Sequence, residues 1–161
     1  MKIKFFAVGG TIDKVYFDAL SKYEIGESNI NDILNNARVN FEPDVSSILK
    51  KDSLDMTDQD RMIVYEAVTN EKNDKIIITH GTDTMIETAK VLNSIKDKTI
   101  VLTGAMEPAK FQSSDAVFNL GSAVAAVQTL HFGVYIVISG RVFTPDKVKK
   151  NRTLKIFEKK M

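Results

Sequence analysis

Apolar residues gather along the chain in short runs rich in β-branched side chains, and such runs are typical of buried strands. Within each run almost every position is apolar, which indicates a sheet covered by helices on both faces. The runs predict strands at Ile3–Val8, Lys75–Thr79, Thr99–Thr103 and Val134–Ser139.

The segments between these runs carry apolar residues at helical spacing. They predict helices over Thr57–Glu71, Thr84–Leu92 and Ser114–Leu130, the last one capped by Ser114 or Asp115. Strands that alternate with such helices form parallel sheets joined by right-handed crossovers. We therefore expect an α/β fold with a doubly wound, mostly parallel sheet of the flavodoxin-like kind.

The segment between Gly10 and Asn29 does not fit this alternation. It mixes aromatic, polar and glycine residues, among them Tyr16, Tyr23 and Gly26. A connection of this length inside a compact domain is usually functional. Two interpretations stay open: a lid that closes over a ligand, and a hairpin without a role.

Length and composition restrict the class of protein. The chain has 161 residues, which fits one domain, 1–161, that needs no disulfide staples. Its 22 basic and 21 acidic residues give a net charge of +1, without the positive excess of a nucleic-acid binder. No apolar stretch reaches the roughly 18 residues of a membrane span, and MKIKFFAVGG lacks the features of a signal peptide. We expect a cytoplasmic protein that binds neither nucleic acid nor a membrane.

Basic residues crowd into the carboxyl-terminal run KVKKNRTLKIFEKKM. We interpret this run as a solvated terminal segment. For the part after Lys150 two forms stay open, a terminal helix packed on the sheet and a frayed end.

Glycine and hydroxyl residues follow the predicted strands, where ligands bind in open parallel sheets. Glycines there let backbone N–H groups approach a ligand closely. The threonine hydroxyls are nucleophiles only when a base activates them, and a partly desolvated lysine could be that base. Sequence distance alone does not select the lysine. The segments concerned are Gly9-Gly10-Thr11, Thr79-His80-Gly81-Thr82-Asp83-Thr84 and Thr103-Gly104-Ala105-Met106.

Structural interpretations of the same residues also stay open. Thr82 and Asp83 could cap a helix and complement its dipole. His80 is best interpreted as a packed, hydrogen-bonded histidine. The chain has no cysteine, and His80 and His131, its only histidines, lack zinc-type spacing. Since the spaced glycines of a dinucleotide fingerprint are also missing, we expect no metal and no cofactor.

Three segments carry a resemblance to the bacterial-type L-asparaginases. VGGTIDK at 8–14 resembles the family's first signature, and THGTDTMIETA at 79–89 is similar to its second. VLTGAMEPAKFQSSDAVFNLGSAVAAV at 101–127 looks like the segment that follows. The resemblance covers essentially the whole chain but only the amino-terminal domain of usual members. It implies a short, single-domain form without the usual carboxyl-terminal domain.

The resemblance implies hydrolysis of L-asparagine to L-aspartate and ammonia through a threonine nucleophile and an acyl-enzyme. Thr11 falls on the nucleophile, and Tyr23 on the flexible-loop tyrosine that helps to activate it. Lys150 falls on the lysine that hydrogen-bonds the second-signature threonine, with Lys149 as the alternative if the register differs by one. The implied catalytic set is Thr11, Tyr23, Thr82, Asp83 and Lys150.

The resemblance also implies how the substrate is held. Ser53 falls on the serine that contacts the substrate carboxylate, and Asp83 would hold the α-amino group. Leu54 stands where many relatives carry a glutamine that touches substrate. The segment Ile12–Ser28 would close over the site. The implied substrate-binding set is Gly10, Ser53, Gly81, Asp83 and Ala105.

The resemblance further suggests a homodimer or a homotetramer. Three other functions stay open: hydrolysis of a related amide such as glutamine, a module that senses an amino acid without turnover, and a purely structural or interaction protein.

Overall fold

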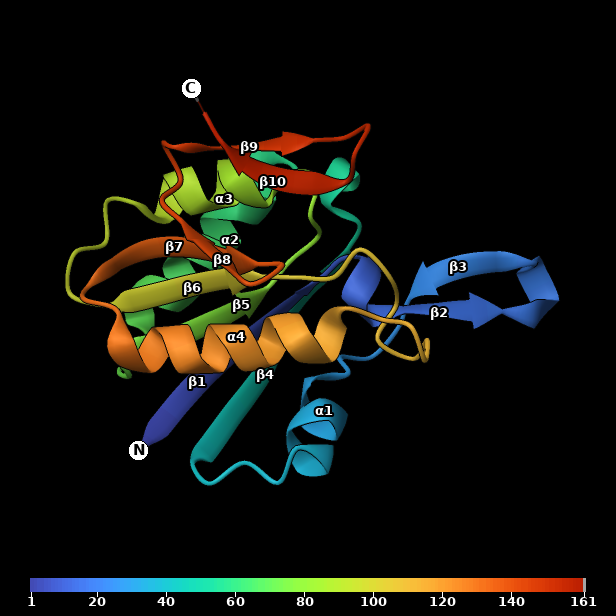
Figure 1. Ribbon diagram of the computed structural model, residues 1–161, viewed down its shortest axis with the longest axis horizontal. Coiled ribbons are helices and arrows are strands. Elements are labelled where there is room, and N and C mark those ends of the chain that lie inside the picture. Colours follow the sequence, from blue (N-terminus) through green and yellow to red (C-terminus); the bar gives the residue numbers. More distant parts are fainter. Residues whose placement is uncertain (161) are drawn as a thin grey trace.

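A six-stranded sheet in the order β4-β1-β5-β6-β7-β8 forms the centre of the computed structural model, which describes residues 1–160 (Figure 1). Five strands are parallel, and β8 runs antiparallel to β7. The predicted fold class is confirmed, and the four predicted strands lie within one residue of their expected ends. The strands are β1 (Lys2–Gly9), β4 (Glu42–Lys51), β5 (Lys75–Thr79), β6 (Thr99–Thr103), β7 (Gly133–Ile138) and β8 (Arg141–Phe143).

Four α-helices flank the sheet within the described residues: α1 (Ile30–Asn36), α2 (Asp58–Asn70), α3 (Met85–Leu92) and α4 (Ala116–Thr129). Apolar residues of α2 and α3 pack on one face, and those of α1 and α4 pack on the other. No helix in residues 1–160 is long and apolar enough to cross a membrane.

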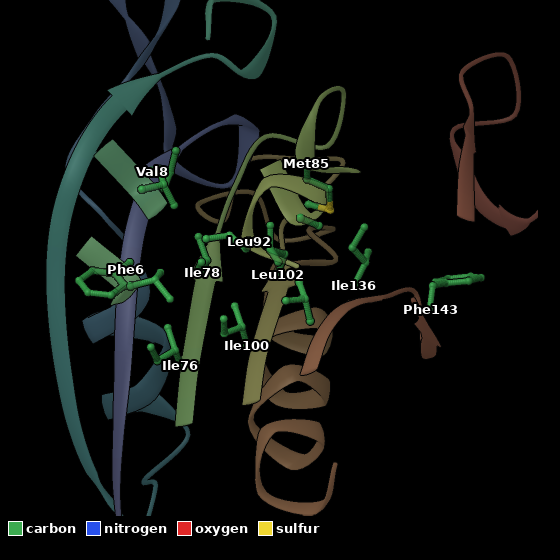
Figure 2. Packing of buried hydrophobic residues seen from close by; sticks show 14 of the residues in the cluster. Phe6, Val8, Ile76, Ile78, Met85, Leu92, Ile100, Leu102, Ile136 and Phe143 are labelled. Atoms are coloured by element: carbon green, nitrogen blue, oxygen red, sulfur yellow. The ribbon is translucent and has the colours of Figure 1, made fainter. Parts of the chain in front are cut away.

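Two hydrophobic cores form, one on each face of the sheet, because successive side chains of a strand point to opposite faces. Ile76 and Ile78 of β5 face α2 and α3, whereas Ile77 faces α1 and α4, and all three are 0% exposed. Figure 2 shows Ile78 beside Leu92, and Ile76 further along the same strand in the core that α2 and α3 cover. Full burial of one such side chain contributes about 2 kcal/mol, which explains why these strands are apolar almost without a break.

One crossover departs from the predicted hand. The β5-α3-β6 and β6-α4-β7 units step in the same direction across the sheet, but α3 and α4 lie on opposite faces (Figure 1). The two crossovers therefore have opposite hands, and the prediction of uniformly right-handed crossovers is wrong at α4. The reason lies in the path after β6: the chain returns towards β1, where the Ala109 N–H donates to the Ile12 carbonyl at 3.0 Å, before α4 begins.

The Gly10–Asn29 segment forms a hairpin that projects from the sheet (Figure 1). Its role as a lid stays a prediction. A short 3₁₀ turn, η1, leads into antiparallel strands joined by a second turn, η2. These elements are η1 (Thr11–Asp13), β2 (Lys14–Phe17), η2 (Asp18–Leu20) and β3 (Lys22–Ile25).

The basic carboxyl-terminal run forms a second antiparallel hairpin, of β9 (Val148–Asn151) and β10 (Ile156–Lys159). The expectation of a terminal helix or a frayed end is therefore wrong. Val148 and Phe157 are 0% and 4% exposed and pack into the core on the α3 side, which anchors the hairpin. Met161, the last residue of the run, lies outside the described residues.

Candidate active site

The carboxyl ends of β1 and β5 meet where the strand order reverses. From β1 the chain leads to β4 on one side, and from β5 it leads to β6 on the other. Open α/β sheets bind ligands at such a switch point. Thr11 follows β1 in η1, and Thr82 and Asp83 follow β5, so three predicted site residues belong to this position.

Backbone segments at the switch point pack too closely for side chains. Gly10 has φ 90°, and a Cβ atom there would overlap the Cα and N atoms of Gly81. A Cβ atom on Gly81 would lie 2.5 Å from the Oγ atom of Ser53, at the start of η3 (Ser53–Asp55). Glycine at both positions therefore lets the ends of β1 and β5 and the turn after β4 contact one another.

Lys150 reaches the switch point from β9. Its Nζ atom donates to Thr82 Oγ1 at 2.7 Å and to Asp83 Oδ1 at 2.8 Å. Only 11% of its side chain is exposed. The Nζ atom of the neighbouring Lys149 lies 3.4 Å from Glu158 Oε1, since adjacent strand residues point to opposite faces. The structure thus brings Lys150, and not Lys149, to Thr82 and Asp83.

A cleft of about 230 Å³ opens at these residues. We call it the strand-end cleft. Its residues come from η1, the β5-α3 connection, the β6-α4 connection, and β9 with the turn after it. The cleft is lined by Thr11, Thr82, Asp83, Met106, Lys150, Arg152 and Lys155.

The β6-α4 connection contributes Met106, which the sequence places at this strand end without assigning it a role. Thr82 Oγ1 lies 3.7 Å from Met106 Sδ, within reach of a weak hydrogen bond. The Asp115 carboxylate accepts the Met106 N–H at 3.0 Å and the Asn119 side-chain amide at 2.8 Å. Asp115 therefore holds this connection instead of capping α4, and the Ser114 hydroxyl accepts the first N–H of that helix.

The predicted substrate-binding residues lie at or beside the same strand ends, but several are buried. Ser53 is 1% exposed, and its Oγ atom accepts the Asp83 N–H at 3.3 Å. Ala105 is also 1% exposed. Gly81 and Ala105 carry no functional side chain and can contribute only backbone groups, and the Gly10 N–H already donates to the Lys51 carbonyl at 3.0 Å.

Tyr23 is not among the residues that line the strand-end cleft. It lies on β3 with half its surface exposed, and its ring centroid is 5.4 Å from that of Tyr16 and 6.0 Å from that of Phe111. It borders a neighbouring pocket together with Leu54 and Lys14. The structure thus places Thr11 and Tyr23 at different pockets.

His80 has the packed environment that the sequence indicated. It is 0% exposed, with Nδ1 2.8 Å from the Gly81 carbonyl and Nε2 2.8 Å from Thr88 Oγ1. Because a carbonyl only accepts, Nδ1 donates to it and Nε2 accepts from the threonine. Burial lowers the pKa of His80 to about 4, so the ring is neutral near pH 7.

Asp13 is a second buried polar group at this edge of the sheet, which the sequence interpretation missed. Asp13 is only 2% exposed, and its Oδ1 atom accepts the backbone N–H of Asn29 at 3.0 Å. Burial raises the pKa of Asp13 to about 6, against the lowering effect of the Asn29 hydrogen bonds. The contact ties the two ends of the amino-terminal hairpin together beside Thr11.

Metal-ligating side chains do not gather anywhere in the part of the chain that the structure describes: no group of three or more His, Asp or Glu residues there could hold an ion.

Comparison with known proteins identifies the family. The asparaginase N-terminal domain model matches residues 2–158. The chain is 32% identical to L-asparaginase 2 of Escherichia coli over 164 residues, covering 94% of this chain and 47% of that protein. It is 35% identical to the glutaminase-asparaginase of Acinetobacter glutaminasificans over 143 residues, covering 85% of this chain and 41% of that protein.

The solved structure of the thermostable L-asparaginase from Thermococcus kodakarensis is also similar. It has a TM-score of 0.85 and 27% identity, and the match covers 99% of this chain and 51% of that one. The chain thus spans about half the length of the relatives it matches. On the strength of the domain match and these relatives, the chain belongs to the asparaginase family, whose N-terminal domain it represents.

Proposed function

We propose that the strand-end cleft is an amidohydrolase site that converts L-asparagine and water to L-aspartate and ammonia. The observation that carries the proposal is the contact of Lys150 with both Thr82 and Asp83, in a cleft that Thr11 also lines. A cation held within 3 Å of a hydroxyl can stabilise its deprotonated form or carry its proton. Family membership supplies the reaction class, and two relatives are named for this activity.

The proposed reaction has two steps. The Thr11 hydroxyl oxygen attacks the side-chain amide carbon, the C–N bond breaks, and the nitrogen leaves as ammonia after taking up the threonine proton. Water then attacks the acyl-enzyme ester, releasing aspartate and restoring the hydroxyl. Lys150 and Thr82 move protons, and backbone N–H groups near Thr11 and Thr82 stabilise the oxyanion.

The proposal assigns substrate binding to the strand ends. Asp83 holds the α-ammonium group, and Ser53 holds the α-carboxylate together with backbone N–H groups of Gly81 and Ala105, while Gly10 lets the strand ends approach one another. Tyr23 contributes only if the amino-terminal hairpin swings towards the cleft and excludes water.

The first experiment measures ammonia release from L-asparagine by the purified protein. We expect release by the parent and none by Thr11→Ala, with full activity in Thr129→Ala at the exposed end of α4 as the matched control. An active Thr11→Ala variant would remove the nucleophile assignment. If the parent releases no ammonia but asparagine raises its melting temperature, the chain is a binding module without turnover.

Glutamine is the second candidate substrate. The relative from Acinetobacter glutaminasificans is named a glutaminase-asparaginase, and Leu54, beside Ser53, is 64% exposed at the edge of the neighbouring pocket. The same assay with L-glutamine distinguishes the two candidate substrates. A higher kcat/KM for L-glutamine than for L-asparagine would make glutamine the preferred substrate.

The assembly and the location of the protein stay predictions. We expect a homodimer or homotetramer, measurable by light scattering, and a cytoplasmic location, measurable by cell fractionation.

A further inference from the structure

The hydroxyl proton of Thr82 is weakly held in the strand-end cleft. A lysine ammonium group only donates hydrogen bonds, so Lys150, whose Nζ atom lies 2.7 Å from Thr82 Oγ1, occupies a lone pair of that oxygen. The hydroxyl therefore gives its own proton to a different atom. The acceptor that residues 1–160 provide is Met106 Sδ at 3.7 Å, and a thioether sulfur is a weak acceptor. The contact thus orients the Thr82 proton without binding it tightly.

Solvent reaches the Met106 side chain through the same cleft. Met106 lines the cleft and is only partly buried, whereas Met85, at the start of α3, is 0% exposed. The chain contains no cysteine, so methionine supplies all of its sulfur. The cleft therefore presents an oxidisable sulfur atom beside Thr82.

Oxidation would turn this weak contact into a strong one. Hydrogen peroxide transfers one oxygen atom to the sulfur: the O–O bond breaks, a sulfur lone pair forms the S–O bond, and the remaining atoms leave as water. The sulfur is oxidised, the peroxide is reduced, and no further reagent is needed. The product is a sulfoxide, whose polar oxygen accepts hydrogen bonds where the thioether accepted only weakly. That oxygen would bind the Thr82 proton and also lie beside the Lys150 ammonium group.

The sulfoxide would affect the cleft in two ways. Thr82 passes protons in the proposed reaction, so tight binding of its hydroxyl proton slows that transfer. The added oxygen atom also occupies part of a cleft of only about 230 Å³. We infer that Met106 is a modification site at which sulfoxidation by peroxide switches the cleft off and methionine sulfoxide reductase switches it on again. The inference rests on the proposed amidohydrolase function and adds its regulation.

The test treats the purified protein with hydrogen peroxide and follows two quantities over time. Peptide mass spectrometry gives the fraction of each methionine converted to sulfoxide, and the ammonia assay gives the rate with L-asparagine. We expect the rate to fall about tenfold in step with the oxidation of Met106, while Met85 stays reduced. Methionine sulfoxide reductases A and B with dithiothreitol should restore the rate.

Two variants show which sulfur is responsible. Met106→Leu, compared with its own untreated rate, should keep that rate under the same peroxide treatment. Met62→Leu is the matched control, because Met62 lies on α2 with 46% of its surface exposed and is open to peroxide without lining the cleft. This variant should lose its rate as the parent does.

Three results would overturn the inference and leave the proposed function standing: a parent that keeps its rate once Met106 is oxidised, a Met106→Leu variant that loses its rate as the parent does, and a Met106 that stays reduced while Met62 is oxidised. If the untreated parent releases no ammonia, the proposed function fails, and the melting temperature with L-asparagine decides. A rise that oxidation removes from the parent but not from Met106→Leu would retain the switch as a control of binding. An unchanged rise, or no rise, would overturn it.

Discussion

Replacement of Asp13 with asparagine should make the protein more stable at neutral pH. The carboxyl group is buried at the base of the amino-terminal hairpin, where the Asn29 N–H groups approach it at 3.0 and 3.5 Å. Burial raises its pKa to about 6, and the nearby Glu27 charge adds to the rise. The native state therefore binds a proton at Asp13 more tightly than the unfolded chain does, whose carboxyl has the ordinary pKa of 3.8.

The sign of the pH dependence follows from this difference. Between about pH 4 and pH 6 the native state carries more protons than the unfolded state, so the free energy of unfolding falls as the pH rises. The interval from 3.8 to about 6 corresponds to about 3 kcal/mol, present below about pH 4 and lost above about pH 6.

Asp13→Asn removes the titration while keeping a side-chain oxygen that accepts from Asn29. We expect its free energy of unfolding to exceed that of the parent by about 1–3 kcal/mol at pH 7.5, with the difference vanishing near pH 4. The assay is urea denaturation followed by circular dichroism from pH 4 to pH 8, because the chain has no tryptophan. Asp97→Asn, whose side chain is 78% exposed, is the control and should show no such trend. A stability difference for Asp13→Asn that is independent of pH would refute the reasoning.

Two further substitutions test the site. Lys150→Met should lower the rate of ammonia release by about 10²–10⁴-fold, since the hydrogen bond from a lysine to Thr82 Oγ1 would be lost, whereas Lys149→Met should stay close to the parent. A parental rate in Lys150→Met would move the proton-transfer role elsewhere. Gly10→Ala should lower the free energy of unfolding by about 3 kcal/mol, because a side chain is strained at φ 90° and overlaps Gly81. Its control, Gly121→Ala, meets no atom within 4 Å on α4 and should raise the free energy of unfolding by about 0.5–1 kcal/mol; equal effects of the two changes in urea denaturation would contradict the close packing.

The parts of the fold that the sequence predicts are those whose burial is uniform. The run Lys75–Thr79 is apolar because both faces of β5 are covered, so its pattern identifies it directly. The edge strand β4 was missed, because it mixes half-buried with exposed positions and contains Pro43, which edge strands tolerate. The hand of the α4 crossover was also missed, since it depends on the contact between Ala109 and Ile12, which no local pattern encodes.

The candidate site was predictable in part. Thr11, Thr82 and Asp83 follow strand ends, and their place at the switch point follows from the α/β pattern. Lys150 lies 68 residues from Thr82, so only the resemblance to a family could connect them. The sequence does not assign Arg152 and Lys155 to the site. The strands that carry their turn, β9 and β10, have only four residues each, so the alternation of buried and exposed side chains is hidden among lysines.

The carboxyl-terminal hairpin brings residues to the strand-end cleft without being part of the six-stranded sheet. Its strands pair only with each other, so the turn 152–155 contributes no hydrogen bond to the six-stranded sheet. Substitution of Arg152 or Lys155 removes a charge from the strand-end cleft and removes no hydrogen bond from the six-stranded sheet. A lineage with this architecture can therefore change the charge presented at the strand-end cleft through substitutions at two positions of one turn, with Thr11 and Lys150 left untouched.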